Sequence, residues 1–187
     1  MCQACSTKPV YEFTNKRKVC ARCFVHYFQK KVFYINRKFG LISRGDVVGF
    51  KSVGGFRDAV LEDVLKFFSE RAGVQVVNAV KNKKYNKLAV SDTIDMNADR
   101  IVHVVFDGDL SKIKKVNPVE GTTIKPLYLF LDEEVLLYAK IRGLKFKVVK
   151  SKKNDKIIEF VDSLNKKHPE LRRAVVSGWL GMNGLSN

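Results

Sequence analysis

The chain of 187 residues is long enough for one α/β core with a small additional lobe, and 45% of its residues are hydrophobic. Its apolar residues stand in short runs that fall well below the roughly 20 residues of a membrane-spanning helix, so we expect no membrane protein. Thirty-five basic and nineteen acidic residues give a net charge of +16, and residues 1–51 hold eleven of the basic and two of the acidic residues. This distribution favours a polyanionic partner for the first part of the chain. Solubility alone is the main alternative, and an acidic protein or membrane surface fits less well.

The four cysteines form two Cys-x-x-Cys motifs separated by fourteen residues: Cys2, Cys5, Cys20 and Cys23. Each motif lets two thiolates meet one ion from a tight turn, and two motifs complete the tetrahedral sulfur shell that zinc prefers. Residues 11–16 predict a small hairpin between them. A ribbon of this size cannot bury its own core, so a structural zinc ion would supply folding energy. The same thiolates could instead hold an iron–sulfur cluster. The sequence shows no apolar secretory segment, and we expect a cytoplasmic protein without disulfides.

A basic helix follows the ribbon. Apolar residues recur every three or four positions and define one helix face that ends before Gly40: Phe24, Phe28, Val32, Ile35 and Phe39. We expect these side chains to pack against the α/β core rather than to stack on bases. We predict that basic residues of the ribbon and of the opposite helix face contact RNA phosphates: Lys16, Arg17, Lys18, Arg22, Lys30, Lys31, Arg37 and Lys38.

The remainder of the chain alternates strand-like and helical segments. A turn and a β-rich run over residues 41–53 precede Gly54-Gly55 and a helix over 56–71, which is the arrangement of a phosphate-binding loop but also of an ordinary tight turn. We expect four further strands, at 74–80, 88–90, 124–127 and 144–149. We expect four further helices, at 93–106, at 131–142, between an Asn154 cap and Pro169, and at 171–180. The pattern predicts a parallel sheet with helices on both faces, and we divide the chain into 1–40 and 41–187.

This order of elements resembles the tRNA 2-thiolation proteins of the PP-loop ATP pyrophosphatase group. Three segments carry the likeness: Val19-Cys20-Ala21-Arg22-Cys23-Phe24, Ile124-Lys125-Pro126-Leu127 followed by Glu134-Val135 and Tyr138, and Asn165 to Glu170. Within the group the chain is most similar to the degenerate subunit family, cytoplasmic tRNA 2-thiolation protein 2. The resemblance implies a zinc ribbon and helix followed by a reduced PP-loop-like sheet of the adenine nucleotide alpha hydrolase type.

The chain departs from this group at the nucleotide loop. Catalytic members carry Ser-Gly-Gly-Lys-Asp-Ser, whereas alignment on the glycines here gives a degenerate loop formed by Val53, Gly54, Gly55, Phe56, Arg57 and Asp58. Val53 has no hydroxyl group and Arg57 cannot bind a cation, so we do not expect ATP as a ligand. In the second ATP segment only Asp95 fits the family pattern. The sequence also has no cysteine after Cys23 to hold a cluster or carry sulfur.

The resemblance therefore implies a non-catalytic subunit that binds tRNA and supports 2-thiolation of the wobble uridine, U34. A catalytic PP-loop partner in a hetero-oligomer would perform the chemistry, with sulfur reaching it from a ubiquitin-like carrier. Two alternatives stay open. The chain could be an autonomous ATP-dependent tRNA sulfurtransferase with a divergent loop, or a zinc-ribbon RNA-binding protein unconnected with thiolation.

Overall fold

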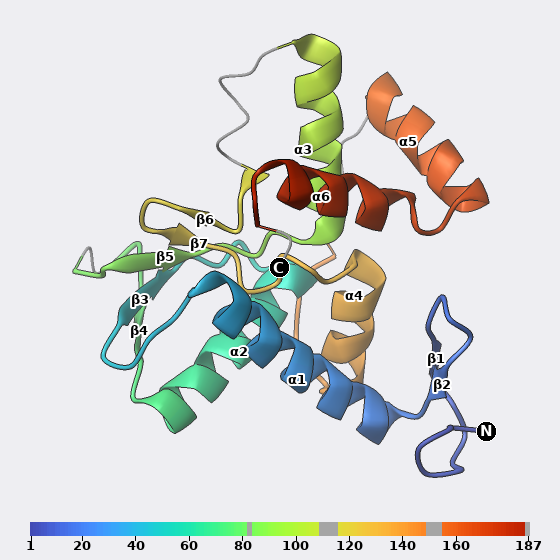
Figure 1. Ribbon diagram of the computed structural model, residues 1–187. Coiled ribbons are helices and arrows are strands. Elements are labelled where there is room, and N and C mark those ends of the chain that lie inside the picture. The colour runs from blue at the N-terminus through green and yellow to red at the C-terminus, as the bar shows by residue number, and fades with distance from the viewer. Residues whose placement is uncertain (82–83, 109–115, 149–154, 186–187) are drawn as a thin grey trace.

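The computed structural model describes residues 1–81, 84–108, 116–148 and 155–185. A small N-terminal hairpin stands at the start of the first long helix, apart from the main sheet (Figure 1). The elements in chain order are β1 Tyr11–Glu12, β2 Lys18–Val19, α1 Ala21–Phe39, β3 Val47–Phe50, α2 Phe56–Ala72, β4 Gln75–Asn78, β5 Lys87–Ala89, α3 Ile94–Asp107, β6 Val119–Glu120, β7 Thr123–Ile124, α4 Asp132–Ile141, α5 Lys156–Lys167 and α6 Leu171–Met182.

The main sheet has the strand order β4-β3-β5-β7-β6. The first four strands are parallel to one another, and Val48 of β3 pairs with Val76 on one side and Lys87 on the other. β6 is antiparallel to β7 and forms one edge. The α/β fold with a largely parallel, helix-flanked sheet confirms the prediction. The antiparallel edge strand is an addition that the sequence pattern did not predict.

Helix α1 belongs to the main hydrophobic core. Its predicted apolar face is buried at Phe24, Phe28, Val32 and Ile35, and Gly40 ends the helix in the left-handed conformation with φ of 59°. The Phe28 ring stacks on Phe130 and on Tyr138 of α4, with ring centroids 4.0 Å apart in both pairs. The same core includes two of the ribbon cysteines. Residues 1–40 therefore share a core with the helices and strands of residues 41–187.

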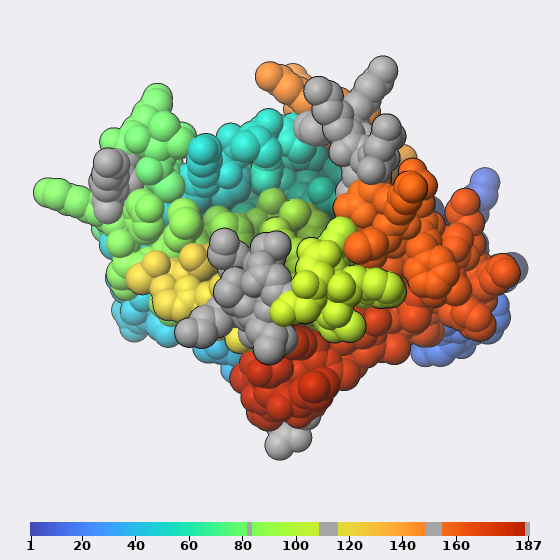
Figure 2. All heavy atoms as spheres, turned by 90° about the horizontal axis from the view of Figure 1, so that it is seen from above, coloured from blue at the N-terminus to red at the C-terminus, as the bar shows by residue number. Residues whose placement is uncertain are grey.

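Helices α3, α5 and α6 form a second layer. Ile94, Ala98 and Ile101 of α3 pack with Val176 and Leu180 of α6 in a separate hydrophobic cluster. The atoms of these three helices adjoin one another and cover part of the face seen in Figure 2. Across the described ranges, each helix lacks the combined length and apolar character that crossing a bilayer requires.

Three expected local structures differ from the prediction. Residues 144–148 are not a strand; the backbone N–H of Lys147 donates to the carbonyl of Gly54 at 2.8 Å, so this segment lies along the loop before α2 instead of joining the sheet. The strand predicted over 124–127 ends at Ile124, where Lys125 leads into Pro126, which has no N–H for a ladder. The N-cap of α5 is Asp155, which accepts from two backbone N–H groups. Asn154 and Val149 lie outside the described residues.

Candidate functional site

The cysteine ribbon brings all four sulfur atoms together. They lie within 4.8 Å of one another, and the Sγ of Cys5 is 3.3 Å from that of Cys20, 3.6 Å from Cys2 and 3.7 Å from Cys23. Four zinc–sulfur bonds of about 2.3 Å in a tetrahedron place the sulfurs about 3.8 Å apart. A four-iron cluster instead puts each cysteine on a different iron, which spreads the sulfurs further. The sulfur positions therefore fit a single tetrahedral ion.

Local backbone structure explains this convergence. A tight turn in the first motif is closed by the Ser6 N–H donating to the Cys2 carbonyl at 2.9 Å. The β1-β2 hairpin then returns the chain so that Cys20 is the N-cap residue of α1, with Cys23 in its first turn. Hydrogen bonds led by the Thr7 hydroxyl lower the pKa of the Cys20 thiol to about 6, whereas contact with Cys5 and Cys20 raises the pKa of Cys23 to about 12. A cation would allow all four groups to be thiolates together.

A groove between the ribbon and α1 brings half of the predicted RNA-binding residues together. We call it the basic groove; its volume is about 870 Å³. Four of its lining residues were predicted to contact RNA: Arg17, Arg22, Lys30 and Lys31. The others are Gln3, Ala4, Val19, Cys23, His26, Tyr27 and Tyr34. The sequence prediction identified these basic residues but not the aromatic side chains beside them.

The other four predicted residues lie outside the groove. Lys16 and Lys18 are exposed on the ribbon and share Glu12, at 3.9 and 3.4 Å. Arg37 and Lys38 stand in the last turn of α1, where cations interact favourably with the helix dipole. These residues extend the positive surface at both ends of α1.

Lys31 differs from its groove neighbours because its charge is already neutralised. Its side chain is 14% exposed, and its Nζ lies 3.1 Å from Oε2 of Glu134, which is fully buried. Burial lowers the pKa of Lys31 to about 8, although the attraction of the Glu134 carboxylate acts in the opposite direction. Tyr27 donates a hydrogen bond to Glu134 at 3.1 Å, and the guanidinium of Arg173 on α6 lies 3.4 Å away. Lys31 thus helps to join α1, α4 and α6.

The degenerate loop is closed by one of its own side chains. Asp58, which is 5% exposed, accepts from the backbone N–H of Val53 at 2.9 Å and of Gly55 at 3.4 Å. Its other oxygen accepts from the Ser91 hydroxyl at 2.7 Å. Val53 points outward and is 73% exposed. The loop N–H groups of Val53 and Gly55, which a phosphate-binding loop would offer to an anion, therefore already bind a carboxylate.

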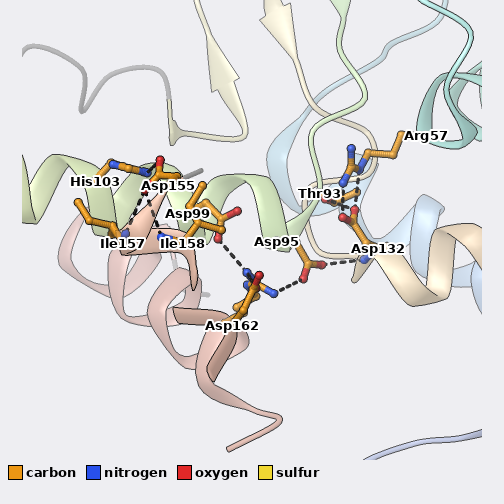
Figure 3. Close-up of polar contacts among 11 residues, drawn as sticks. Arg57, Thr93, Asp95, Asp99, His103, Asp132, Asp155, Ile157, Ile158 and Asp162 are labelled. Atoms are coloured by element: carbon orange, nitrogen blue, oxygen red, sulfur yellow. Dashed lines mark hydrogen bonds and ion pairs between the residues drawn. The ribbon is translucent and has the colours of Figure 1, made fainter. Parts of the chain in front are cut away.

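Arg57 is held by Asp132 at the start of α4. Its guanidinium donates to both carboxylate oxygens, with Nε 2.6 Å from Oδ1, and Thr93 donates to the same carboxylate at 2.7 Å (Figure 3). The backbone N–H of Asp132 donates to Asp95 at 2.7 Å. Burial alone would lower the pKa of Arg57, but the hydrogen bond and charge of Asp132, together with the charges of Asp95 and Asp92, outweigh burial and raise the pKa. Asp95, the one residue expected to fit the second ATP segment, thus serves the same network.

A cleft of about 590 Å³ next to this network is crossed by Arg172 of α6. Its guanidinium bridges three carboxylates, at 3.2 Å to Asp95, 3.0 Å to Asp99 and 2.7 Å to Asp162. Sequence reasoning missed both Arg172 and Asp132. Asp132 occurs in a run of acids that suits any helix start, and Arg172 precedes another arginine on an amphipathic helix, so no local signal distinguished either residue.

The chain resembles solved structures, although its sequence matches neither a family model nor a curated protein. The solved structures include the U34-tRNA thiolase NcsA from Methanococcus maripaludis with its [4Fe-4S] cluster, which superposes with a TM-score of 0.74. The match covers 97% of this chain and 86% of that chain at 17% sequence identity. The chain therefore has the fold of this tRNA thiolase over almost its whole length.

Proposed function

We propose that the protein is a non-catalytic subunit of a tRNA 2-thiolation complex, of the kind represented by cytoplasmic tRNA 2-thiolation protein 2. It binds tRNA and supports 2-thiolation of U34 by a catalytic PP-loop partner. The fold shared with a U34-tRNA thiolase supports a role in tRNA thiolation. The family-like segments around Cys20, Lys125 and Pro169 support the same assignment.

The absence of catalysis rests chiefly on Asp58. A loop that binds pyrophosphate needs free backbone N–H groups at a helix N-terminus. Here the carboxylate of Asp58 accepts from two of them and is itself held by Ser91. A bound anion would have to displace this internal carboxylate and would meet its negative charge. These internal hydrogen bonds support a loop that does not bind pyrophosphate.

Two further observations support a partner that performs the chemistry. Arg57 stands where catalytic members have the loop aspartate, and it is committed to Asp132 instead of a metal ion. All four cysteines of the sequence belong to the ribbon, so no other thiolate can carry sulfur. The partner would supply the adenylating site and receive sulfur from a ubiquitin-like carrier in the cytoplasm.

The ribbon holds a structural zinc ion in this proposal. Sulfur atoms 3.3–3.7 Å from Cys5 suit one ion, and each cysteine would contribute one thiolate. The ion would fix the ribbon against the N-terminus of α1 and so form one wall of the basic groove. The tRNA phosphates would lie along Arg17, Arg22 and Lys30 and along the charged ends of α1.

Calorimetric titration with Mg-ATP tests the catalytic part of the proposal. The purified chain should show no saturable heat, whereas a catalytic PP-loop thiolase measured in parallel should. The Asp58→Asn variant, which keeps an oxygen for the loop N–H groups, should also bind no ATP. Saturable ATP binding that Arg57→Ala abolishes together with turnover would instead establish an autonomous sulfurtransferase.

Affinity purification from the native host tests the partner. The tagged chain should recover a PP-loop protein that carries the complete Ser-Gly-Gly-Lys-Asp-Ser loop, and deletion should lower wobble 2-thiolation. Recovery of no such protein, with thiolation unchanged on deletion, would leave a zinc-ribbon RNA-binding protein outside this pathway.

A further inference from the structure

One face of α1 carries a stripe of exposed residues inside the basic groove. The stripe runs at intervals of four residues through Arg22, His26, Lys30 and Tyr34, all of which line the groove and are exposed. Residues four apart lie above one another on a helix, about 6 Å apart. The stripe therefore places an aromatic ring in line with two cations.

The described part of the chain offers no carboxylate as an ion-pair partner to the two cations of this stripe, Arg22 and Lys30. The residues that line the groove include no acid. Within the described ranges, Arg22 and Lys30 have no ion-pair partner, and Arg17 stands 4.8 Å from the centre of the Phe13 ring rather than beside a carboxylate. Among the described residues, Lys31 is the one cation of the groove with an ion-pair partner, the buried Glu134. The groove therefore attracts anions.

Tyr34 differs from the other aromatic residues of α1. Phe24 and Phe28 are fully buried, and Tyr27 is half-buried with its hydroxyl on Glu134. Tyr34 is 45% exposed, and Lys38 stands over its ring at 5.9 Å from the centroid. Tyr34 is therefore the exposed aromatic side chain of α1 that lines the groove. Nucleobases stack on such rings irrespective of their sequence.

We propose that the basic groove binds an unpaired nucleotide of RNA. Its base stacks on Tyr34, and the flanking phosphates bind Arg22 and Lys30. A volume of about 870 Å³ is large enough to hold a nucleotide. Unpaired loop bases are also the parts of RNA that reach aromatic side chains, whereas paired bases stay stacked in the helix. The identification of that RNA as tRNA rests on the proposed function.

Fluorescence anisotropy with two labelled RNAs tests this inference: a hairpin with an unpaired loop, and a blunt duplex of equal length. The hairpin should bind more tightly to the full chain. Tyr34→Ala should weaken hairpin binding about tenfold, the loss typical of one stacked base, and leave duplex binding unchanged. Tyr34→Phe should retain hairpin affinity because it keeps the ring. Lys30→Ala should weaken binding of both RNAs.

Phe160→Ala is the matched control, because Phe160 is 53% exposed on α5, which lies away from α1 (Figure 1). It should leave both affinities unchanged, and metal content and circular dichroism should show that each variant is folded. If the native chain bound the two RNAs with equal affinity, or if Tyr34→Ala did not change hairpin binding, the nucleotide site would be overturned. RNA binding by the protein would not be contradicted by either result. Loss of affinity in Tyr34→Phe would contradict stacking. Failure to bind either RNA would overturn both this inference and the tRNA-binding role.

Discussion

The basic groove and the degenerate loop differ in how their charges are satisfied. In the groove, Arg22 and Lys30 face solvent without a partner among the described residues. Around the loop, Arg57 binds Asp132, and Arg172 binds three carboxylates. An ion pair within the protein lowers the electrostatic attraction that a ligand could gain, whereas an unopposed cation retains it. In the proposed function, the ribbon and α1 recognise RNA, whereas the ion-paired residues around the loop stabilise the fold.

The largest expected effect comes from breaking the ribbon. Cys20→Ser should release the metal, and the ribbon amides should lose hydrogen-exchange protection, because structural zinc contributes on the order of 10 kcal/mol to folding such modules. Elemental analysis of the native chain should find one zinc and no iron. Ala4→Ser, in the same turn, should retain the metal. A Cys20→Ser variant that keeps one zinc per chain would contradict the assignment.

Glu134 tests the ion pair that neutralises Lys31 of the groove. Glu134→Ala leaves the largely buried Lys31 without its carboxylate, whereas Arg173 keeps Glu170, so it should lower the free energy of unfolding by about 3–5 kcal/mol. Urea denaturation gives this value. Glu133→Ala, one residue earlier and exposed, is the control and should cost less than about 1 kcal/mol. Equal losses in the two variants would show that the buried pair does not join the helices.

The pH dependence of stability also tests the burial of Lys31. The pKa of Lys31 falls to about 8 in the folded chain, below its unfolded value of about 10.4, so the unfolded state binds more protons between these limits. The stability of the native chain relative to Lys31→Met should therefore rise with pH in this window, by roughly 1.4 kcal/mol per pH unit. A difference that is flat or falls from pH 8 to pH 10 would contradict the burial of a charged lysine.

Asp58 tests the loop side of the comparison. Asp58→Ala removes the acceptor for two loop N–H groups, so it should lower the free energy of unfolding by about 1 kcal/mol. Asp58→Asn retains an oxygen for those groups and an amide toward Ser91, and it should cost less. Thermal denaturation compares the two variants. An Asp58→Ala variant as stable as the native chain would mean that the internal carboxylate does not stabilise the loop.

The sequence predicted those features whose signals are local. The buried face of α1 was predicted from the spacing of its apolar residues, Phe24, Phe28, Val32 and Ile35, and its end was predicted from Gly40. The paired motifs gave the cysteine cluster, whose four sulfur atoms do converge. The alternation of elements gave the α/β sheet. Each depends on contacts that recur within a few residues of the chain or on a well-defined ligand geometry.

The remaining features depend on contacts between distant segments. Lys31 occurs among the charged residues of an amphipathic helix, and only the fold shows that it meets Glu134 from α4 and not solvent. Arg57 and Asp132 are likewise joined across 75 positions. The strand predicted at 144–149 does not form over 144–148, because the apolar residues of this segment pack beside the loop before α2. There Phe146 contacts Phe56. Local periodicity does not reveal which of several partners a segment will meet.

The salt dependence of tRNA binding tests the contrast between the two regions most directly. We expect log Kd to vary linearly with log salt concentration for the native chain, and the slope to fall by about 1.5 when Arg22→Ala and Lys30→Ala remove two phosphate contacts. Lys66→Ala, which removes a cation paired with Glu62 on α2, should leave the slope unchanged. Equal slopes for the native chain and the Arg22→Ala/Lys30→Ala variant would contradict the assignment of RNA recognition to the ribbon and α1.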